Sequence, residues 1–134
     1  MISDTTLLRI EDLESVYATI PPMPCKAGCG KCCGPVMATE LEAQRVEAAI
    51  VGLPRSSDAL DCPAMDPQTK ACRAYAVRPM LCRLYGHVPN MTCPEGCRPA
   101  KQMRDTEARG LLTLVERIGG RARLLGGQTP PKNR

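Results

Sequence analysis

The sequence predicts a small, α-rich and irregular domain organised by metal, with three main helices, cysteine loops between them and at most one short hairpin (α+β at most). Three observations lead to this fold class. The 134-residue chain has no Phe, no Trp and only three Tyr, so aromatic side chains supply little of its core. Its nine cysteines offer the disulfides or metal sites with which core-poor domains compensate. Thirteen prolines and eleven glycines indicate long irregular connections.

Three stretches have helical periodicity. Residues 6–17 carry apolar side chains at helical spacing, with Ser3 among the polar residues that offer a cap. Thr39 and Glu42 have the spacing of a capping box and open a second helix. Residues 100–118 form the longest predicted helix. Its apolar side carries Met103, Ala108, Leu111, Leu112, Val115 and Ile118.

The connections between the helices carry most of the remaining cysteines. Residues 62–72 predict a short hairpin or double turn, because Asp66-Pro67 starts a reversal and a cysteine stands on each arm. Residues 75–84 predict one or two helical turns around Arg78-Pro79. Residues 90–99 predict a loop. We expect Tyr75 and Tyr85 to supply the main aromatic packing.

The chain divides into three parts. We expect an N-terminal helix over residues 1–20, a cysteine-cluster metal-binding domain with a long C-terminal helix over 21–118, and a flexible basic tail over 119–134. All fourteen acidic residues precede position 119, so the tail accounts for the net charge of +4. Its basic residues are Arg121, Arg123, Lys132 and Arg134. A mobile terminus is favoured over contact with nucleic acid.

The stretch from Cys25 to Cys33 concentrates the chemistry. It places four thiols in C-x-x-x-C-x-x-C-C spacing, and the glycines among them let the backbone wrap around a cation. The N-terminus has no basic region followed by an apolar run, and no window is apolar enough to span a membrane. We therefore expect a cytoplasmic protein without membrane contact, in which metal is favoured over disulfides or a reduced thiol core.

The order of the cysteine motifs resembles a known family. The likeness is carried by the Cys-Gly-Lys-Cys-Cys run at 29–33, by Cys62-Pro63, and by the pattern Cys72-x-x-Tyr75-x-x-Arg78-Pro79-x-x-Cys82-Arg83 with Tyr85 close behind. These features are similar to the CxxCxxCC family, also called YkgJ-like cysteine-cluster proteins, which chelate zinc or iron. The resemblance covers about residues 25 to 105. The chain departs from the family in opening with C-x-x-x-C instead of C-x-x-C.

The resemblance implies eight metal-ligating thiols: Cys25, Cys29, Cys32, Cys33, Cys62, Cys72, Cys82 and Cys97. Eight thiols suit two four-cysteine zinc sites, two cubane clusters, or one cluster with further structural thiols. Cys93 is additional to the family set, and His87, the single histidine, could replace a cysteine as a ligand. Arg78, Arg83 and Tyr75 are expected to support the site, since positive charge stabilises thiolates.

The predicted function is that of a cysteine-ligated metal-binding module. An iron–sulfur centre, of the 4Fe–4S type, is slightly favoured over zinc, because the first cluster concentrates its ligands as cluster loops do. We expect a structural or interaction protein that works with a partner protein or within a larger assembly, and not an enzyme. The alternatives are an electron-transfer iron–sulfur protein and an accessory to a SAM-dependent protein methylase. Cys25, Cys29 and Cys32 reproduce the radical-SAM spacing, but the strands of the required barrel are missing.

Overall fold

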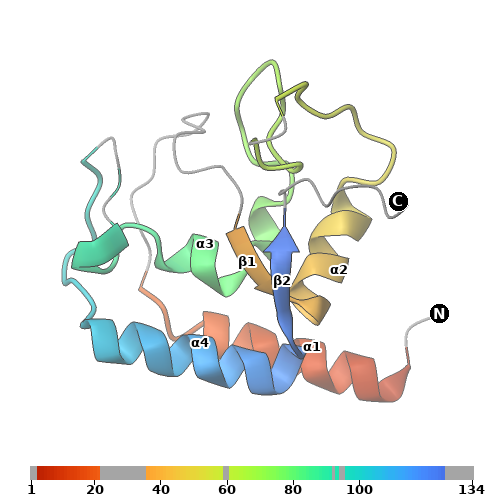
Figure 1. Cartoon of the computed structure of the whole chain (residues 1–134). Coiled ribbons are helices and arrows are strands. Elements are labelled where there is room, and N and C mark those ends of the chain that lie inside the picture. The colour runs from red at the N-terminus through yellow and green to blue at the C-terminus, as the bar shows by residue number, and fades with distance from the viewer. Residues whose placement is uncertain (1–2, 22–35, 59–60, 92, 94–95, 126–134) are drawn as a thin grey trace.

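The computed structural model of the chain describes residues 3–21, 36–58, 61–91, 93 and 96–125. Within these ranges lie four α-helices and a two-stranded antiparallel sheet, which confirms the α-rich class. The elements in chain order are α1 (Asp4–Tyr17), β1 (Val36–Thr39), α2 (Glu40–Ala49), the 3₁₀ turn η1 (Tyr75–Val77), α3 (Met80–Leu84), the 3₁₀ turn η2 (Pro89–Met91), α4 (Asp105–Gly119) and β2 (Ala122–Leu125). Helices α1 and α4 lie side by side, run in opposite directions and form a layer beneath α2, α3 and the sheet (Figure 1).

Helix α1 is capped as its sequence predicts. The Ser3 hydroxyl accepts a hydrogen bond from the Thr6 amide at 3.1 Å, so the helix begins at Asp4, two residues before the predicted start. Arg9 Nε donates to the carbonyl of Ile118 at 2.8 Å and ties α1 to the end of α4. The N-terminal helix therefore belongs to the same packed body as α4.

Helix α2 begins at the predicted capping box. The Glu42 amide donates to Thr39 Oγ1 at 3.3 Å, and the Thr39 amide donates to Glu42 Oε1 at 3.1 Å. Both residues are almost completely buried. The box therefore closes the helix start and at the same time brings a carboxylate into the interior.

Helix α4 begins five residues later than predicted, at Asp105 instead of residue 100. The Met103 amide donates to the His87 carbonyl at 2.7 Å, and Arg104 has extended backbone angles, with φ −76° and ψ 152°. This bond holds the chain extended up to the helix start. The predicted apolar stripe is confirmed, because all six of its residues lie in the core or pack against it.

The connection between α2 and α4 follows the sequence prediction. Met65 pairs with Cys72 across a turn in which the Asp66 amide donates to the Ala71 carbonyl at 2.8 Å. Asp66 Oδ1 accepts from two further amides of the turn, at 2.8 and 3.2 Å, as expected of an aspartate that starts a reversal. The helical turns predicted over residues 75–84 are η1 and α3, with Pro79 at the start of α3.

The second strand of the sheet, β2, lies where the sequence predicted a tail. Strand β2 pairs antiparallel with β1, in the register Val36 opposite Leu125 and Thr39 opposite Ala122. Arg123 fastens this strand to α2 through Glu40 and Glu47, with nitrogen–oxygen distances of 2.8 and 3.0 Å. The prediction of a flexible tail from residue 119 is therefore wrong for residues 122–125, because strand pairing and two ion pairs hold them. Residues 126–134 lie outside the described ranges.

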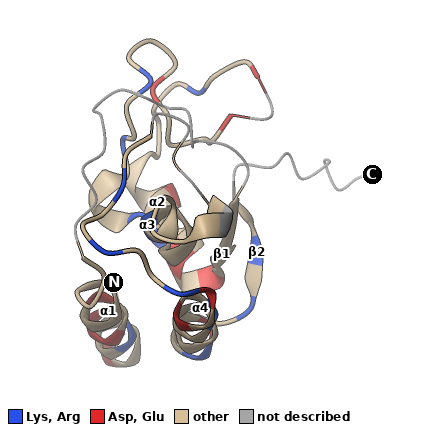
Figure 2. Ribbon diagram, turned by 90° about the vertical axis from the view of Figure 1, so that its left-hand side faces the viewer, with Lys and Arg blue, Asp and Glu red and all other residues tan. Residues whose placement is uncertain are grey.

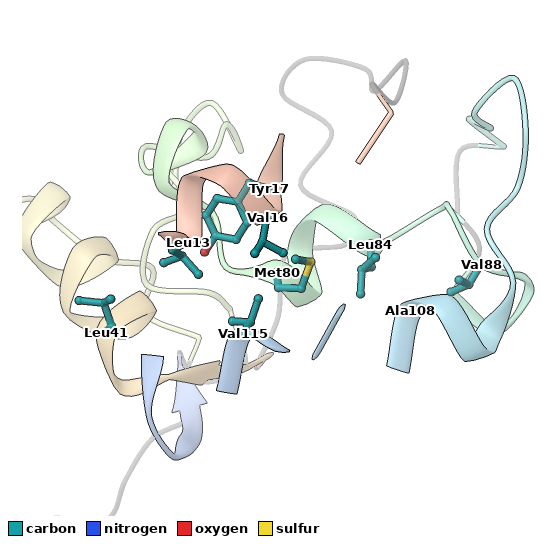
Figure 3. Packing of buried hydrophobic residues seen from close by; sticks show 9 residues of the cluster. All are labelled: Leu13, Val16, Tyr17, Leu41, Met80, Leu84, Val88, Ala108 and Val115. Atoms are coloured by element: carbon teal, nitrogen blue, oxygen red, sulfur yellow. The ribbon is translucent and has the colours of Figure 1, made fainter. Parts of the chain in front are cut away.

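Two apolar clusters fill the interior. The helix core (Figure 3) consists of Leu13, Val16, Tyr17, Leu41, Met80, Leu84, Val88, Ala108 and Val115. The sheet core consists of Ala38, Ala43, Val46, Ile50, Cys62, Ala64, Met65, Ala74 and Leu125. Tyr17 is the buried aromatic residue, whereas Tyr75 is 53% exposed. The prediction that Tyr75 packs in the core is therefore wrong, and the core depends on small aliphatic side chains.

Two glycines of α4 give opposite predictions for the same substitution. A Cβ on Gly119 would overlap the side chain of Thr39, whereas a Cβ on Gly110 would meet nothing within 4 Å. We expect Gly119→Ala to lower the free energy of unfolding by about 2–3 kcal/mol, since it overpacks the site and disturbs the cap of α2. Gly110→Ala should raise it by about 1 kcal/mol through helix propensity. Urea unfolding of both variants measures the difference, and changes of equal sign would contradict the packing of α4 against Thr39.

Candidate metal centre

The predicted thiol ligands divide into two groups. Cys25, Cys29, Cys32 and Cys33 lie outside the described residues. The structure places Cys62, Cys72, Cys82, Cys93 and Cys97, of which Cys62 is buried and the other four are partly exposed. Within the described ranges, no three His, Cys, Asp or Glu side chains gather closely enough to hold a metal ion. Which thiols share a centre therefore stays a prediction.

Arg73 fixes the segment that carries Cys62 and Cys72. Its guanidinium donates to three successive carbonyls after Cys62, each at 3.3 Å, and to the carbonyl of Pro54 at 2.7 Å. The three successive carbonyls belong to Pro63, Ala64 and Met65. Because Arg73 directly follows Cys72, these bonds hold the two arms of the turn together.

Arg83 and Arg78 shape the segment that carries Cys82. Arg83 Nε donates to the Arg78 carbonyl at 2.7 Å, and its Nη2 donates to the Ala76 carbonyl at 3.0 Å. Arg78 stacks on the ring of Tyr75 at 3.8 Å from the centroid, and its Nε donates to the Tyr75 carbonyl at 3.1 Å. The three residues predicted to support the site are thus joined to one another around the start of α3. Direct support of metal-bound thiolates by them stays a prediction.

Tyr17 connects this segment to the N-terminal helix. The guanidinium of Arg83 lies 3.7 Å from the centroid of the Tyr17 ring, and the Tyr17 hydroxyl donates to Glu42 Oε2 at 2.5 Å. Burial and the negative charge of Glu42 raise the pKa of the Tyr17 phenol above its usual range, so the phenol keeps its proton. Helix α1 therefore contacts both the Arg-Pro-x-x-Cys-Arg segment and the cap of α2.

The sequence identifies Glu42 as a helix cap but does not reveal its wider role in this region. Its side chain is 2% exposed and accepts four hydrogen bonds. Oε2 receives the Tyr17 hydroxyl and the Met80 amide, at 2.5 and 2.6 Å, and Oε1 receives the amide and hydroxyl of Thr39, both at 3.1 Å. These four donors satisfy the hydrogen-bonding needs of the buried carboxylate. It anchors the first residue of α3, the helix that carries Cys82.

His87 is buried without a complete set of partners. Its side chain is 1% exposed, and among the described residues Nδ1 has no hydrogen-bond partner. An orphaned buried nitrogen costs about 1–3 kcal/mol of stability unless a ligand or water satisfies it. Burial, together with the positive charge of Arg78, lowers the pKa of His87 below its usual value, so the imidazole is neutral at neutral pH.

These donors fit the chemistry of zinc or iron. Thiolates and neutral imidazole are the ligands that both metals take in proteins, and a ligating nitrogen must carry no proton. Hydrogen bonds from Arg73 and Arg83 to backbone carbonyls, and from the Met80 amide to Glu42, hold the segments that carry Cys62, Cys72 and Cys82. These bonds position the segments without a large aromatic core. The described part of the chain therefore offers sulfur from five cysteines and nitrogen from one histidine.

Comparison with known proteins gives one match. The family model CxxCxxCC, described as "Putative zinc- or iron-chelating domain", matches residues 24–108, more than half of the chain. No curated protein and no solved structure matches the sequence or the fold. Within the described residues, no helix is long and apolar enough to cross a membrane. The matched range begins before the first cysteine and ends inside α4.

Proposed function

The chain belongs to the CxxCxxCC family of zinc- or iron-chelating domains and binds metal, and from this premise we propose that it is a structural module in which cysteine-ligated metal organises a surface for a partner protein. The observation that carries the proposal is the way its described cysteines are held. Arg73 fixes the turn with Cys62 and Cys72, and Arg83 with Glu42 fixes the helix with Cys82. These charged side chains bind backbone groups and so position the segments that carry the thiols.

An iron–sulfur centre of the 4Fe–4S type is favoured over zinc. The first cluster places four thiols within nine residues, whereas zinc ribbons usually present two separated C-x-x-C pairs. Cys62 and Cys93 are each followed by proline, as in ferredoxin-type cluster loops. Basic residues next to the described thiols, Arg73 and Arg83 among them, favour an anionic centre.

The partner surface is proposed from exposed apolar side chains. The stripe of α4 packs inside the protein and is not available for a partner. Met37 and Leu124 instead face each other across the sheet, and both are about half exposed. Further exposed apolar residues are Leu7, Leu8, Val51, Leu53 and Leu114. Helices α1 and α4 carry charges of both signs, which does not favour nucleic acid as the partner (Figure 2).

Electron transfer is the second candidate. A redox centre must lie near the surface to exchange electrons, and four of the five described cysteines are partly exposed. A structural centre and a redox centre can share the same ligands. The two functions differ in whether the metal changes its oxidation state at a potential that a cellular partner can reach.

The test is metal and sulfide analysis with a visible absorption spectrum, on untagged protein purified without air. Iron together with acid-labile sulfide and a brown colour is the expected result, and a reversible one-electron titration would then favour electron transfer over the structural role. Colourless protein with one or two zinc ions per chain would retain the structural module and exclude the cluster. Folded protein without either metal would contradict the proposed function.

A further inference from the structure

We propose that Tyr17 is a positioning residue for Cys82: it holds both ends of the short helix α3, so that docking of the N-terminal helix controls how firmly the protein retains its metal. The inference rests on the proposed function, with Cys82 among the ligands that the family resemblance implies, and extends it. Tyr17 lies outside the range that the family model matches, residues 24–108, whereas Glu42, Met80 and Arg83, through which it acts, lie within that range. The family match therefore assigns no role to α1.

The first end of α3 is held through the Tyr17 hydroxyl. This hydroxyl donates to Glu42 Oε2 at 2.5 Å, and the same oxygen accepts the amide of Met80 at 2.6 Å. Pro79, the residue before α3, makes no side-chain capping bond, so Glu42 takes the place of a cap for the first amide of the helix. Because Tyr17 and Met80 share one carboxylate oxygen, the Tyr17 hydroxyl fixes the oxygen on which α3 begins.

The other end of α3 is held through the Tyr17 ring. The guanidinium of Arg83 lies 3.7 Å from the centroid of this ring, at a distance typical of a cation–π contact. The same guanidinium donates to the carbonyls of Arg78 and Ala76, at 2.7 and 3.0 Å, so it also ties the chain before α3 to the helix. Cys82 directly precedes Arg83, so the two contacts of Tyr17 stand on either side of the cysteine.

Helix α1 is docked by further contacts besides these two. Leu13 and Val16 are buried in the helix core, and Glu14 forms an ion pair with Arg45 of α2 at 2.7 Å. The ring of Tyr17 lies beside Val16 at the end of α1 (Figure 3). A substitution of Tyr17 can therefore loosen α3 while α1 stays docked, which separates the proposed role of this residue from ordinary packing.

Hydrogen exchange in the metal-loaded full-length protein tests the hold on α3, with the amides of α4 in the same sample as the reference. Tyr17→Phe keeps the ring and removes the hydroxyl, whereas Tyr17→Leu removes both contacts. We expect exchange in α3 to accelerate relative to α4 by about 10-fold in Tyr17→Phe, as loss of a hydrogen bond to a charged group implies, and by more in Tyr17→Leu. Val16→Ala, the control, leaves a cavity in the same core and should accelerate both helices alike. An unchanged ratio of α3 to α4 exchange in Tyr17→Phe would overturn the inference, even if Tyr17→Leu fails to fold.

Competition with a chelator tests the effect on metal binding. Loss of an outer-shell partner of a metal ligand costs roughly 10–100-fold in metal affinity, and we expect Tyr17→Leu to lie near the lower end of that range. Tyr17→Phe should show a smaller loss, and Val16→Ala should remain close to the wild type. Faster exchange in α3 without weaker metal binding would overturn the inference and leave the proposed function intact. Wild-type protein without metal would contradict the proposed function and the inference together.

Discussion

Cys32→Ser should leave the protein unfolded and without metal. A structural metal site contributes on the order of 10 kcal/mol to folding, and a domain of this size has a total stability of about 5–15 kcal/mol. The described core has neither Phe nor Trp and cannot replace that contribution. The same result is expected for Cys29→Ser. Both cysteines lie outside the described residues, so the prediction rests on the cluster motif and the family match.

Circular dichroism and metal content of the purified variants check this prediction. Cys93→Ser is the matched control, because Cys93 is additional to the family set and should change neither quantity. Removing metal from the wild-type protein with a chelator should reproduce the loss of helical signal without any substitution. Unchanged helical signal and metal content in both Cys29→Ser and Cys32→Ser would show that metal does not organise this fold.

Glu42→Gln should lower the free energy of unfolding by about 3–5 kcal/mol. The substitution replaces one carboxylate oxygen by an NH₂ group that faces a backbone N–H and a hydroxyl, so the bond from the N–H is lost and the other donors lose a charged acceptor. A hydrogen bond to a charged group contributes about 1.5–3 kcal/mol. Tyr17, Thr39 and Met80 all donate to this carboxylate, and α1, α2 and α3 would therefore separate together.

Urea unfolding of the metal-loaded protein measures the effect. The control is Glu47→Gln, which removes an ion pair with Arg123 at 3.0 Å from a carboxylate that is 45% exposed. A surface ion pair contributes about 0–1 kcal/mol, so this variant should remain close to the wild type. Equal losses in the two variants would contradict a special role of the buried carboxylate.

The sequence predicts local features of this fold well. The capping box at Thr39, the reversal at Asp66 and the helical turns around Pro79 each depend on neighbouring residues, and all three are present. Local hydrogen bonds determine such features, so a short window of sequence contains the necessary information. The cysteine motifs likewise identify the family, because ligand spacing is a local property as well.

The features that the sequence does not reveal join distant parts of the chain. Strand β2 has four residues, too few for a recognisable alternation, and its partner lies more than eighty residues away. Arg73 binds carbonyls, which every residue possesses, so no sequence signal marks its partners. Glu42 is recognisable as a helix cap, but its bonds to Tyr17 and Met80 exist only because three helices meet. The grouping of thiols into metal centres likewise depends on contacts between distant parts of the chain, so the sequence does not reveal it.

The pairing of β1 with β2 affects the order in which the protein folds during synthesis. On a ribosome, Val36–Thr39 emerges long before Ala122–Leu125, and the sheet forms only when both are available. The late strand also follows directly on α4, whose last residue packs against the Thr39 cap. Closing so long a loop costs entropy before any contact compensates for it, and such topologies fold slowly. All nine cysteines precede β2 in the chain, so they are synthesised before the sheet can form.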